Sequence, residues 1–438
     1  QERNLKIIET GAAKELLKEV FKPQDDETTP AYNRRIHDLF EEIEPRCGLL
    51  NRRGQGEIEF FHLTFQEFLA ARHMFYTEID YKQFLEKGWW EETLLLYAGL
   101  INREWKDKAN RMVNEILTHP PGEDETGNRR IWLMGCKALR DIPEYKRDSG
   151  VLTLAREKLQ CIIAQDISAS LEERFEAGEI LGILGDPRIN VLSPPMVTVE
   201  AGDFIRGSEE RDREKPARNI YLDEFMIGKY PVTNQEFKVF IDDGGYKNKE
   251  LWTPEGWQWR NENNISEPGS WHDRKWNGAN FPVVEVSWYE ASAYAEWLSG
   301  KTGEKYVLPS EAQWEKAARG SSGFTYPWGE KWKEDYCNSN ECGLRHTSPV
   351  GIFLAGQSSY GCLDMAGNVW EWCADWYGAD YYKKSPYRNP QGPTDGSYRV
   401  MRGGSWFISR WYCRAACRNA NHPAVRFDGY GFRLARLF

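Results

Sequence analysis

Tryptophan is distributed unevenly along this chain of 438 residues, and this distribution most constrains how the chain can fold. Fifteen of the nineteen tryptophans lie between Trp252 and Trp411, and only four precede them. Because each tryptophan carries a large apolar surface and an N–H that needs a partner when buried, this density indicates a core braced by aromatic rings. The chain is also too long for a single hydrophobic core. We therefore predict two or three domains of different kinds.

Composition excludes several classes of protein. Hydrophobic residues make up 40% of the chain and charged residues 28%, and the formal net charge is −10. No excess of Lys and Arg is present to displace phosphate counterions, so we expect no general nucleic-acid binding. A run of about eighteen apolar residues is absent, so we expect no membrane span. The nine cysteines form no CxxC pair, which favours reduced thiols and a cytoplasmic location.

The N-terminal region, residues 1–80, contains a helix followed by a strand and a second helix. Leu5 to Phe21 has apolar residues at helical spacing, and Ile58 to Phe61 reads as a short strand. Thr64 and Glu67 form a capping box, so a helix is predicted to begin at Thr64. His62 lies at the junction between this strand and this helix.

The segment Phe60 to Ala71 resembles the end of the winged-helix domain in NACHT-type signalling ATPases, a group of STAND NTPases. In that family the matching histidine contacts the nucleotide phosphate, so the resemblance implies a nucleotide-sensing role for His62 in the full-length protein. The alternative is that His62 only packs the strand–helix junction. The sequence has no GxxxxGK[ST] phosphate loop. The chain also begins at Gln1 without an initiator Met, so we expect the ATPase core to lie upstream in a longer protein.

Amphipathic helical segments recur between residues 81 and 190. They are Thr93 to Leu100, Ile131 to Leu139, Leu152 to Ile163 and Phe175 to Leu184. Stacked, HEAT-like helical hairpins fit this spacing. We therefore predict an all-α N-terminal region that consists of a winged-helix remnant (1–80) and a helical transmitter (81–190).

Residues 191–438 mix short strands, capped helices and long loops. Met196 to Val199 alternates as a strand. Three capping boxes each predict a helix start: Thr233 with Glu236, Ser287 with Glu290, and Ser310 with Gln313. These features predict an α+β domain with much irregular backbone.

One loop of this domain combines carboxylates with a glycine turn. Asp364 and Glu371 bracket the turn, and the carbonyls of Gly367 and Val369 are free to point inward. Carboxylate and carbonyl oxygens are the ligands that calcium prefers, so we predict a structural calcium site. The alternative is that Glu371 bonds the backbone amides of the loop.

Seven ordered motifs give residues 191–438 a family resemblance. They are Met196-Val197-x-Val199, Pro231 to Asn234, Val286 to Trp288, Leu308 to Glu315, Tyr326 to Gly329, Asp364 to Trp372 and Arg402 to Trp406. Together they resemble the formylglycine-generating-enzyme family, a variant of the C-type lectin fold. The resemblance places a family calcium site at the four positions just named and a second one near Asn338.

The family's enzyme holds copper with two cysteines five residues apart, after its R-G-G-S motif. In this chain the second position is Cys413, but the first is Ile408. Because a single thiolate does not make this site, we expect no copper and no oxidase activity.

The segment 402–433 differs from the rest of the domain. Its ends are rich in Gly and Arg, whereas its interior sets large aromatics beside Asn, Asp and Gly without a helical or strand period. Rigid aromatics among small polar residues are typical of binding surfaces. The alternative is an irregular piece of the core.

The same segment resembles the C-terminus of variable proteins in diversity-generating retroelements. The resemblance implies a fixed set of residues: Arg402, Gly403, Gly404, Ser405, Trp406, Cys413, Arg414, Arg418, Pro423, Gly431, Phe432 and Arg433. It also implies a diversified, ligand-binding set: Phe407, Ile408, Ser409, Trp411, Tyr412, Asn419, Ala420, Asn421, His422, Val425, Phe427, Asp428 and Tyr430.

The function expected from these resemblances is that of a receptor. The ligand would be a protein or another macromolecule, and the upstream NTPase of the same protein would be the signalling partner. The alternatives are a non-diversified binding module derived from the enzyme family and an active copper-dependent oxidase.

Overall fold

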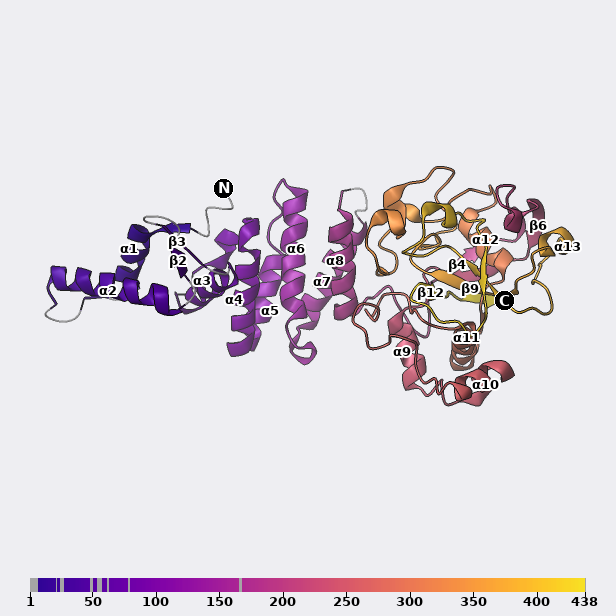
Figure 1. Cartoon of the computed structure of the whole chain (residues 1–438), viewed down its shortest axis with the longest axis horizontal. Helices are drawn as coiled ribbons and strands as arrows, with labels where there is room; N and C mark the ends of the chain where they lie inside the picture. The colour runs from indigo at the N-terminus through magenta and orange to yellow at the C-terminus, as the bar shows by residue number, and fades with distance from the viewer. Residues whose placement is uncertain are drawn as a thin grey trace. The chain divides into compact units, whose positions relative to one another are not determined.

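The computed structural model describes residues 7–20, 22–23, 27–47, 50–52, 57–60, 63–77, 79–164 and 168–437. The chain forms two compact units, Gln1–Ala155 and Arg156–Phe438 (Figure 1). The first unit is mainly helical, and the second mixes sheets with helices, as the sequence predicts.

A three-stranded antiparallel sheet stands at the start of the first unit. Its middle strand is β3 (Glu57–Phe60), which pairs with β1 (Ile7–Glu9) and β2 (Leu50–Arg52). The helix predicted from Leu5 is therefore shorter, because residues 7–9 pair with β3 and α1 (Thr10–Val20) begins only after them. The predicted strand Ile58 to Phe61 corresponds to β3, whereas strands β1 and β2 were not predicted. Helix α2 (Thr29–Cys47) follows.

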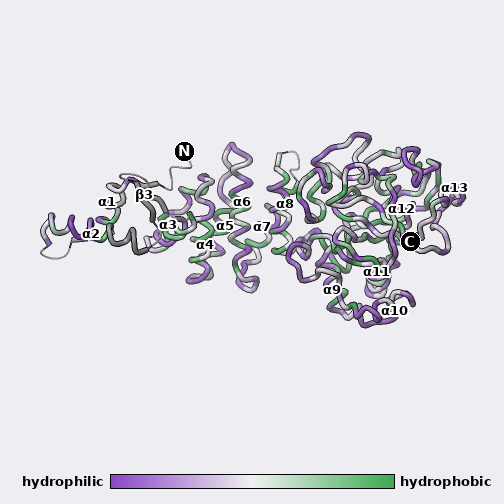
Figure 2. The backbone as a smooth tube through the Cα atoms, viewed as in Figure 1, coloured by the Kyte–Doolittle hydropathy of each residue, from purple (hydrophilic) through white to green (hydrophobic). Residues whose placement is uncertain are grey.

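Helix α3 (Leu63–Thr77) includes Leu63, one residue before the predicted start. His62 lies outside the described residues. Helices α4 (Glu91–Glu104), α5 (Lys106–Leu117) and α6 (Glu125–Arg140) then pack against one another. Figure 2 shows hydrophobic and hydrophilic stretches alternating along them, and no helix in the described ranges is long and apolar enough to cross a membrane.

Helix α8 (Leu171–Leu184) belongs to the C-terminal unit, and the division between the units falls within α7 (Ser149–Ala164). Asn280 donates to the carbonyl of Gly178 on α8 at 2.9 Å and to Asp186 Oδ2, just after α8, also at 2.9 Å. Arg174 donates to the carbonyl of Ile352 at 2.5 Å. Helix α8 therefore docks on the domain that follows it, within the compact unit that begins at Arg156.

The C-terminal unit contains three sheets. One has the order β11–β10–β9–β12 and comprises β9 (Trp370–Trp376), β10 (Arg399–Arg402), β11 (Asn419–Asn421) and β12 (Tyr430–Gly431). The second has the order β4–β7–β13–β8 and comprises β4 (Met196–Val199), β7 (Phe225–Gly228), β8 (Lys305–Val307) and β13 (Ala435–Leu437). A hairpin pairs β5 (Gly202–Arg206) with β6 (Arg218–Leu222).

The three predicted capping boxes are all present. They begin α9 (Asn234–Asp242), α11 (Trp288–Thr302) and α12 (Glu311–Arg319). In each, the cap hydroxyl accepts from the third helical N–H, and the Glu or Gln side chain accepts from the cap N–H. Two shorter helices, α10 (Pro254–Glu262) and α13 (Tyr381–Lys384), complete the unit.

The core of the C-terminal unit is aromatic, as the tryptophan density predicts. The main buried cluster joins α9 and α11 to the central strand β9. Phe237 and Tyr294 stack with ring centroids 5.5 Å apart, and both rings contact Phe432 near the C-terminus. Helices α9 and α11 are thereby packed in one core with the C-terminal segment.

Candidate functional site: a variable-type surface on a buried arginine frame

In the segment 402–433, burial follows the predicted division into fixed and diversified positions. Of the twelve residues predicted to be fixed, eleven are buried, and Trp406 is half-buried. None of the thirteen residues predicted to be diversified is buried. Buried positions and positions that are at least partly exposed therefore alternate along one segment.

Arg402 at the end of β10 ties this segment to helix α12. Its Nη2 donates to Glu315 Oε2 at 2.6 Å, and neither side chain is exposed. The same guanidinium donates to the carbonyls of Ala415, Ala416 and Cys417 at 2.8 to 3.0 Å. Burial alone would lower the pKa of Arg402, but the carboxylate of Glu315 raises it, so this side chain remains charged. One arginine thus fixes the backbone of a loop that has no regular structure of its own.

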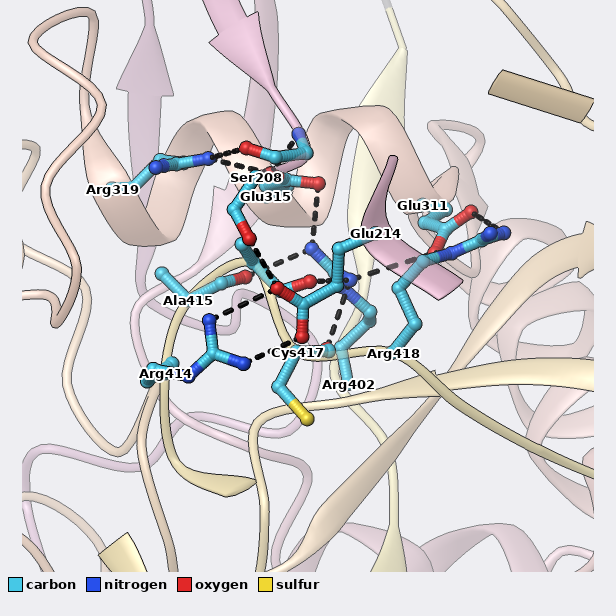
Figure 3. Close-up of polar contacts among 12 residues, drawn as sticks. Ser208, Glu214, Glu311, Glu315, Arg319, Arg402, Arg414, Ala415, Cys417 and Arg418 are labelled. Atoms are coloured by element: carbon cyan, nitrogen blue, oxygen red, sulfur yellow. Dashed lines mark hydrogen bonds and ion pairs between the residues drawn. The ribbon is translucent and has the colours of Figure 1, made fainter. Parts of the chain in front are cut away.

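Two more predicted fixed arginines form two-pronged pairs with buried glutamates (Figure 3). Arg414 donates to both carboxylate oxygens of Glu214, at 2.9 and 2.6 Å. Arg418 donates to both oxygens of Glu311, at 2.6 and 2.8 Å. Such forked pairs fix orientation as well as distance. Because both glutamates lie outside the segment, the pairs join it to the rest of the domain.

Glycine conformation completes the frame at the start of the segment. Gly403 and Gly404 have φ values of 100° and 79°, which side chains other than glycine rarely adopt. A Cβ on Gly403 would lie 3.1 Å from Trp314, and one on Gly404 would lie 2.9 Å from the Cys413 sulfur. At both positions the backbone conformation and the close neighbours favour glycine.

The loop predicted to bind calcium has a different electrostatic arrangement. Glu371 Oε2 accepts from Arg433 Nε at 2.6 Å and from Trp314 Nε1 at 2.7 Å, and its Oε1 accepts from Arg433 Nη2 at 2.7 Å. A buried guanidinium therefore supplies the positive charge that a cation would bring. Asp364 Oδ2 accepts from the Gly351 N–H at 2.7 Å.

Burial raises the pKa of Asp364 to about 6. In the part of the chain that the structure describes, no group of three or more His, Cys, Asp or Glu side chains is placed to hold a metal. As arranged, the Glu371 carboxylate is paired with Arg433, and Asp364 is bonded to the Gly351 N–H. The calcium site at Asp364, Gly367, Val369 and Glu371 stays a prediction.

The exposed face of the segment is aromatic. Trp411 is 52% exposed, Tyr412 42% and Phe427 44%. Phe427 forms ring contacts with Phe407 and Tyr430, with centroids 5.4 and 5.3 Å apart. These rings present an apolar surface to solvent. An irregular piece of the core would bury them instead.

A cavity of about 510 Å³ opens beside these rings. Six of the thirteen predicted ligand-binding residues line it: Phe407, Ile408, Tyr412, Asn419, Phe427 and Tyr430. Buried Trp370, Cys417 and Arg418 line it as well. The structure thus brings half of the predicted set together around one hollow.

The other seven predicted residues do not line this cavity. They are Ser409, Trp411, Ala420, Asn421, His422, Val425 and Asp428. Ala420 and Asn421 belong to the edge strand β11, and Asn421 donates to the Tyr430 hydroxyl at 3.1 Å. His422 is exposed, and the Asp428 carbonyl accepts from Trp406 Nε1 at 3.2 Å.

Sequence reasoning missed the opposite wall of the cavity, which comes from a loop two hundred residues away. Arg211, Arg213 and Glu214 line it. The Arg211 guanidinium lies 4.8 Å from the Tyr412 ring centroid, and the Arg213 carbonyl accepts from Arg418 Nη1 at 2.9 Å. In the sequence this loop is a run of alternating charges. A solvated turn has the same pattern, so the sequence alone does not mark the loop as part of a binding site.

The family's enzyme has copper-binding cysteines at two positions, which are Ile408 and Cys413 in this chain. Together these two side chains do not suit copper. Ile408 offers no ligand atom and packs partly buried against the main core. Cys413 is completely buried and packs with Cys337 and Ala366 in a small apolar cluster. Burial raises the pKa of the Cys337 thiol well above its ordinary value, and a hydrogen bond with Cys413 adds to the effect.

The fold and site define a mixed sheet-and-helix domain that carries an exposed aromatic surface on a frame of buried arginine–glutamate pairs. Residues 186–438 match the family of sulfatase-modifying factor enzyme 1-like domains, and the chain belongs to that family. Residues 1–74 match the winged helix-turn-helix domain that lies C-terminal to NACHT.

Known proteins similar to this chain carry different names. Formylglycine-generating enzyme of Thermomonospora curvata is 34% identical over 297 residues, which cover 56% of this chain and 94% of that protein. Serine/threonine-protein kinase pkn1 of Chlamydia caviae is 39% identical over 255 residues, which cover 56% of this chain and only 38% of that protein. Among solved structures, Treponema denticola variable protein 1 matches with a TM-score of 0.45 and 24% identity, over 55% of this chain and 94% of that one.

Proposed function

We propose that the C-terminal unit is a ligand-binding receptor domain whose surface at 402–433 is diversified by a retroelement. The observation that carries this proposal is the separation of roles within the segment. The predicted fixed residues are buried, and none of the predicted diversified residues is. A substitution at an exposed position changes the surface without removing a buried partner, which is what a variable surface requires.

The exposed aromatics support binding rather than a purely structural role. Trp411, Tyr412 and Phe427 are each more than two-fifths exposed on one segment. Clustered exposed aromatics are unfavourable for solubility unless they contact a partner, and such residues are enriched among those that dominate binding energy. The ligand in this proposal is a protein or another macromolecule.

The same proposal makes this chain a binder rather than an enzyme. The family includes formylglycine-generating enzymes, so loss of activity has to be argued from the residues present. Ile408 has no ligand atom where the family's enzyme has its first cysteine. A single thiolate at Cys413 leaves a soft copper ion without its second sulfur ligand.

We further propose that ligand capture biases a signalling NTPase. The match of residues 1–74 to a domain found C-terminal to NACHT supports this connection. The helices between the two matched regions would transmit the change, and His62 would sense nucleotide in the full-length protein. The bound ligand has to favour one of two states of the NTPase for such a signal to pass.

The test is a selection of binders from a phage-displayed library of random peptides against the whole chain. Substituting Trp411, Tyr412 and Phe427 together by Ser is expected to abolish most of the selected interactions. A matched control substitutes Trp89, Tyr145 and Tyr398, which are 47%, 82% and 52% exposed, by Ser elsewhere on the chain. Equal binding by both triple variants would contradict a ligand site at this surface. Diversification is tested in the nucleotide sequence, where a near-repeat of the 3′ end beside a reverse transcriptase gene is expected.

A further inference from the structure

The cavity beside the variable surface has one wall that the proposed diversification does not reach. The loop 208–215 supplies this wall through Arg211, Arg213 and Glu214. Its arginines sit opposite the aromatic rings of the segment 402–433. A ligand that enters the cavity therefore meets both walls, and only one of them belongs to the predicted diversified set.

The loop is held rigidly by the frame under the variable surface. Glu214 is 1% exposed and forms the two-pronged pair with Arg414. The Glu214 N–H donates to the Arg211 carbonyl at 2.9 Å, and Ser208 N–H donates to the Glu214 carbonyl at 3.1 Å. The backbone of this wall thus depends on buried residues, whereas the Arg211 side chain also contacts the exposed Tyr412 ring.

Charge at this wall is uncompensated at two side chains. Glu214 is neutralised by Arg414, and Arg418 is neutralised by Glu311. Arg211 and Arg213 are both exposed, and no carboxylate of the described residues forms an ion pair with either of them. Two guanidinium groups without an ion pair among the described residues therefore line the cavity beside an apolar, aromatic face.

The acidic residues of the same loop have other partners. Glu210 lies 3.1 Å from Arg414 Nη1, and Asp212 lies 3.1 Å from Lys215 Nζ. Glu209 accepts from the Ala217 N–H at 2.8 Å. None of these three carboxylates lines the cavity.

We propose that Arg211 and Arg213 form a constant anion-recognising wall, so that the cavity takes an acidic peptide segment with an apolar or aromatic side chain next to its carboxylate. This inference rests on the proposed ligand-binding function and names the class of ligand. Arg211 is held over the Tyr412 ring, where a cation–π contact limits its freedom before any ligand arrives. The variable rings contact the apolar part of the ligand, and the two guanidinium groups contact its carboxylate.

A peptide fits these observations better than a nucleic acid does. Two uncompensated arginines match one or two carboxylates, whereas a nucleic-acid strand needs a longer row of basic groups to displace its counterions. The chain as a whole carries a formal net charge of −10, which opposes a polyanion at long range.

The experiment uses three blocked tripeptides, acetyl-Glu-Trp-Glu-amide and its Gln-Trp-Gln and Lys-Trp-Lys counterparts, measured by saturation-transfer NMR on the whole chain. Affinity is expected to fall in that order, with the acidic and basic peptides differing by about threefold to tenfold at low salt. The variant Arg211→Ser/Arg213→Ser is expected to lose this preference. The variant Lys249→Ser/Lys384→Ser removes the same charge from exposed positions away from the cavity and is expected to keep it.

Several outcomes overturn the inference. They are equal binding of the three peptides, no signal from any of them at about 10 mM, a preference that survives in the arginine variant, or tighter binding of oligothymidylate than of the acidic peptide. The proposed function is judged separately, by the library selection and the aromatic variants. Selected peptides that depend on Trp411, Tyr412 and Phe427 and yet show no preference for acidic residues are a separate outcome. That result would support the proposed function and contradict only the anion-recognising wall.

Discussion

Arg402 Nη2 lies 2.6 Å from Glu315 Oε2, with both side chains completely buried. Glu315 also accepts from Arg319 Nη1 at 3.0 Å and from the Gly207 N–H at 2.7 Å. One carboxylate on helix α12 thus holds the start of the segment 402–433 and the start of the loop 208–215 at once. The two walls of the cavity share this support.

Removing that carboxylate is expected to destabilise the domain strongly. Glu315→Gln removes the counter-charge of buried Arg319 and the nearer of the two carboxylates beside Arg402, whose Nη1 still lies 3.5 Å from Glu311 Oε1. Breaking a buried pair from one side costs about 3–5 kcal/mol. Urea unfolding measures the loss. The matched control is Asp242→Asn, which breaks the exposed Lys238–Asp242 pair on α9 and is expected to cost less than about 1 kcal/mol. Similar losses in both variants would contradict the role of the frame.

A second prediction concerns pH. Burial raises the pKa of Asp375 from 3.8 to about 7, and the charge of Glu311 adds to the rise. A carboxyl whose pKa is higher in the folded state contributes stability below its unfolded pKa and loses it as pH rises through the folded pKa. Wild type should therefore lose stability relative to Asp375→Asn between about pH 4 and 7, by up to about 1.4 kcal/mol per pH unit.

The comparison with Asp375→Asn isolates this residue, because burial also raises the pKa values of Glu236, to about 7, and Asp364, to about 6. The Asn side chain keeps an acceptor for the Glu311 N–H, which now donates to Asp375 Oδ2 at 2.7 Å. Exposed Asp395→Asn serves as the control and should track wild type. Parallel pH profiles for wild type and Asp375→Asn would show that this carboxyl titrates normally.

Calcium removal is expected to leave the melting temperature unchanged. Arg433 already neutralises Glu371, so no bound cation is needed to make this loop stable. Differential scanning fluorimetry with EGTA, followed by added calcium, measures the effect on wild type and on Asp364→Asn. A fall of the wild-type melting temperature that calcium restores, absent in the variant, would reinstate the predicted site.

Oxidation of a cysteine-containing sulfatase peptide is expected to be absent. With copper(I) and oxygen supplied, mass spectrometry should find no formylglycine, because Ile408 replaces the first of the two thiolates. Cys413→Ser provides the blank. Formylglycine that forms with wild type and not with Cys413→Ser would show that the chain is an active oxidase, and would contradict this prediction.

Much of the C-terminal fold was readable from local sequence rules. The boxes at Thr233, Ser287 and Ser310 each place a helix start, because the hydrogen bonds of a capping box lie within four residues. Helix α10 was missed, although Thr253 caps it and Pro254 stands at its first turn. That signal lies in a loop-like stretch without apolar periodicity.

Features that depend on distant pairing were not readable in the same way. The apolar spacing of Leu5 to Phe21 predicts helix at Ile7–Glu9, whereas the pairing of this strand with β3 joins residues about fifty positions apart. Glu371 was assigned to calcium because sequence does not reveal that Arg433 reaches it. The exposed set was predicted through resemblance, whereas Arg211 and Arg213 reach the same cavity only through the fold.

The central claim is that buried pairs hold the fold while exposed positions are free to change, and unfolding of one multiple variant tests it most directly. Replacing Trp411, Tyr412, His422 and Phe427 together by Ser removes four exposed side chains, including the cation–π contact of Tyr412 and the ring contacts of Phe427. The account predicts a combined loss below about 2 kcal/mol, against about 3–5 kcal/mol for Glu315→Gln alone. A loss in the quadruple variant equal to that of Glu315→Gln would contradict it.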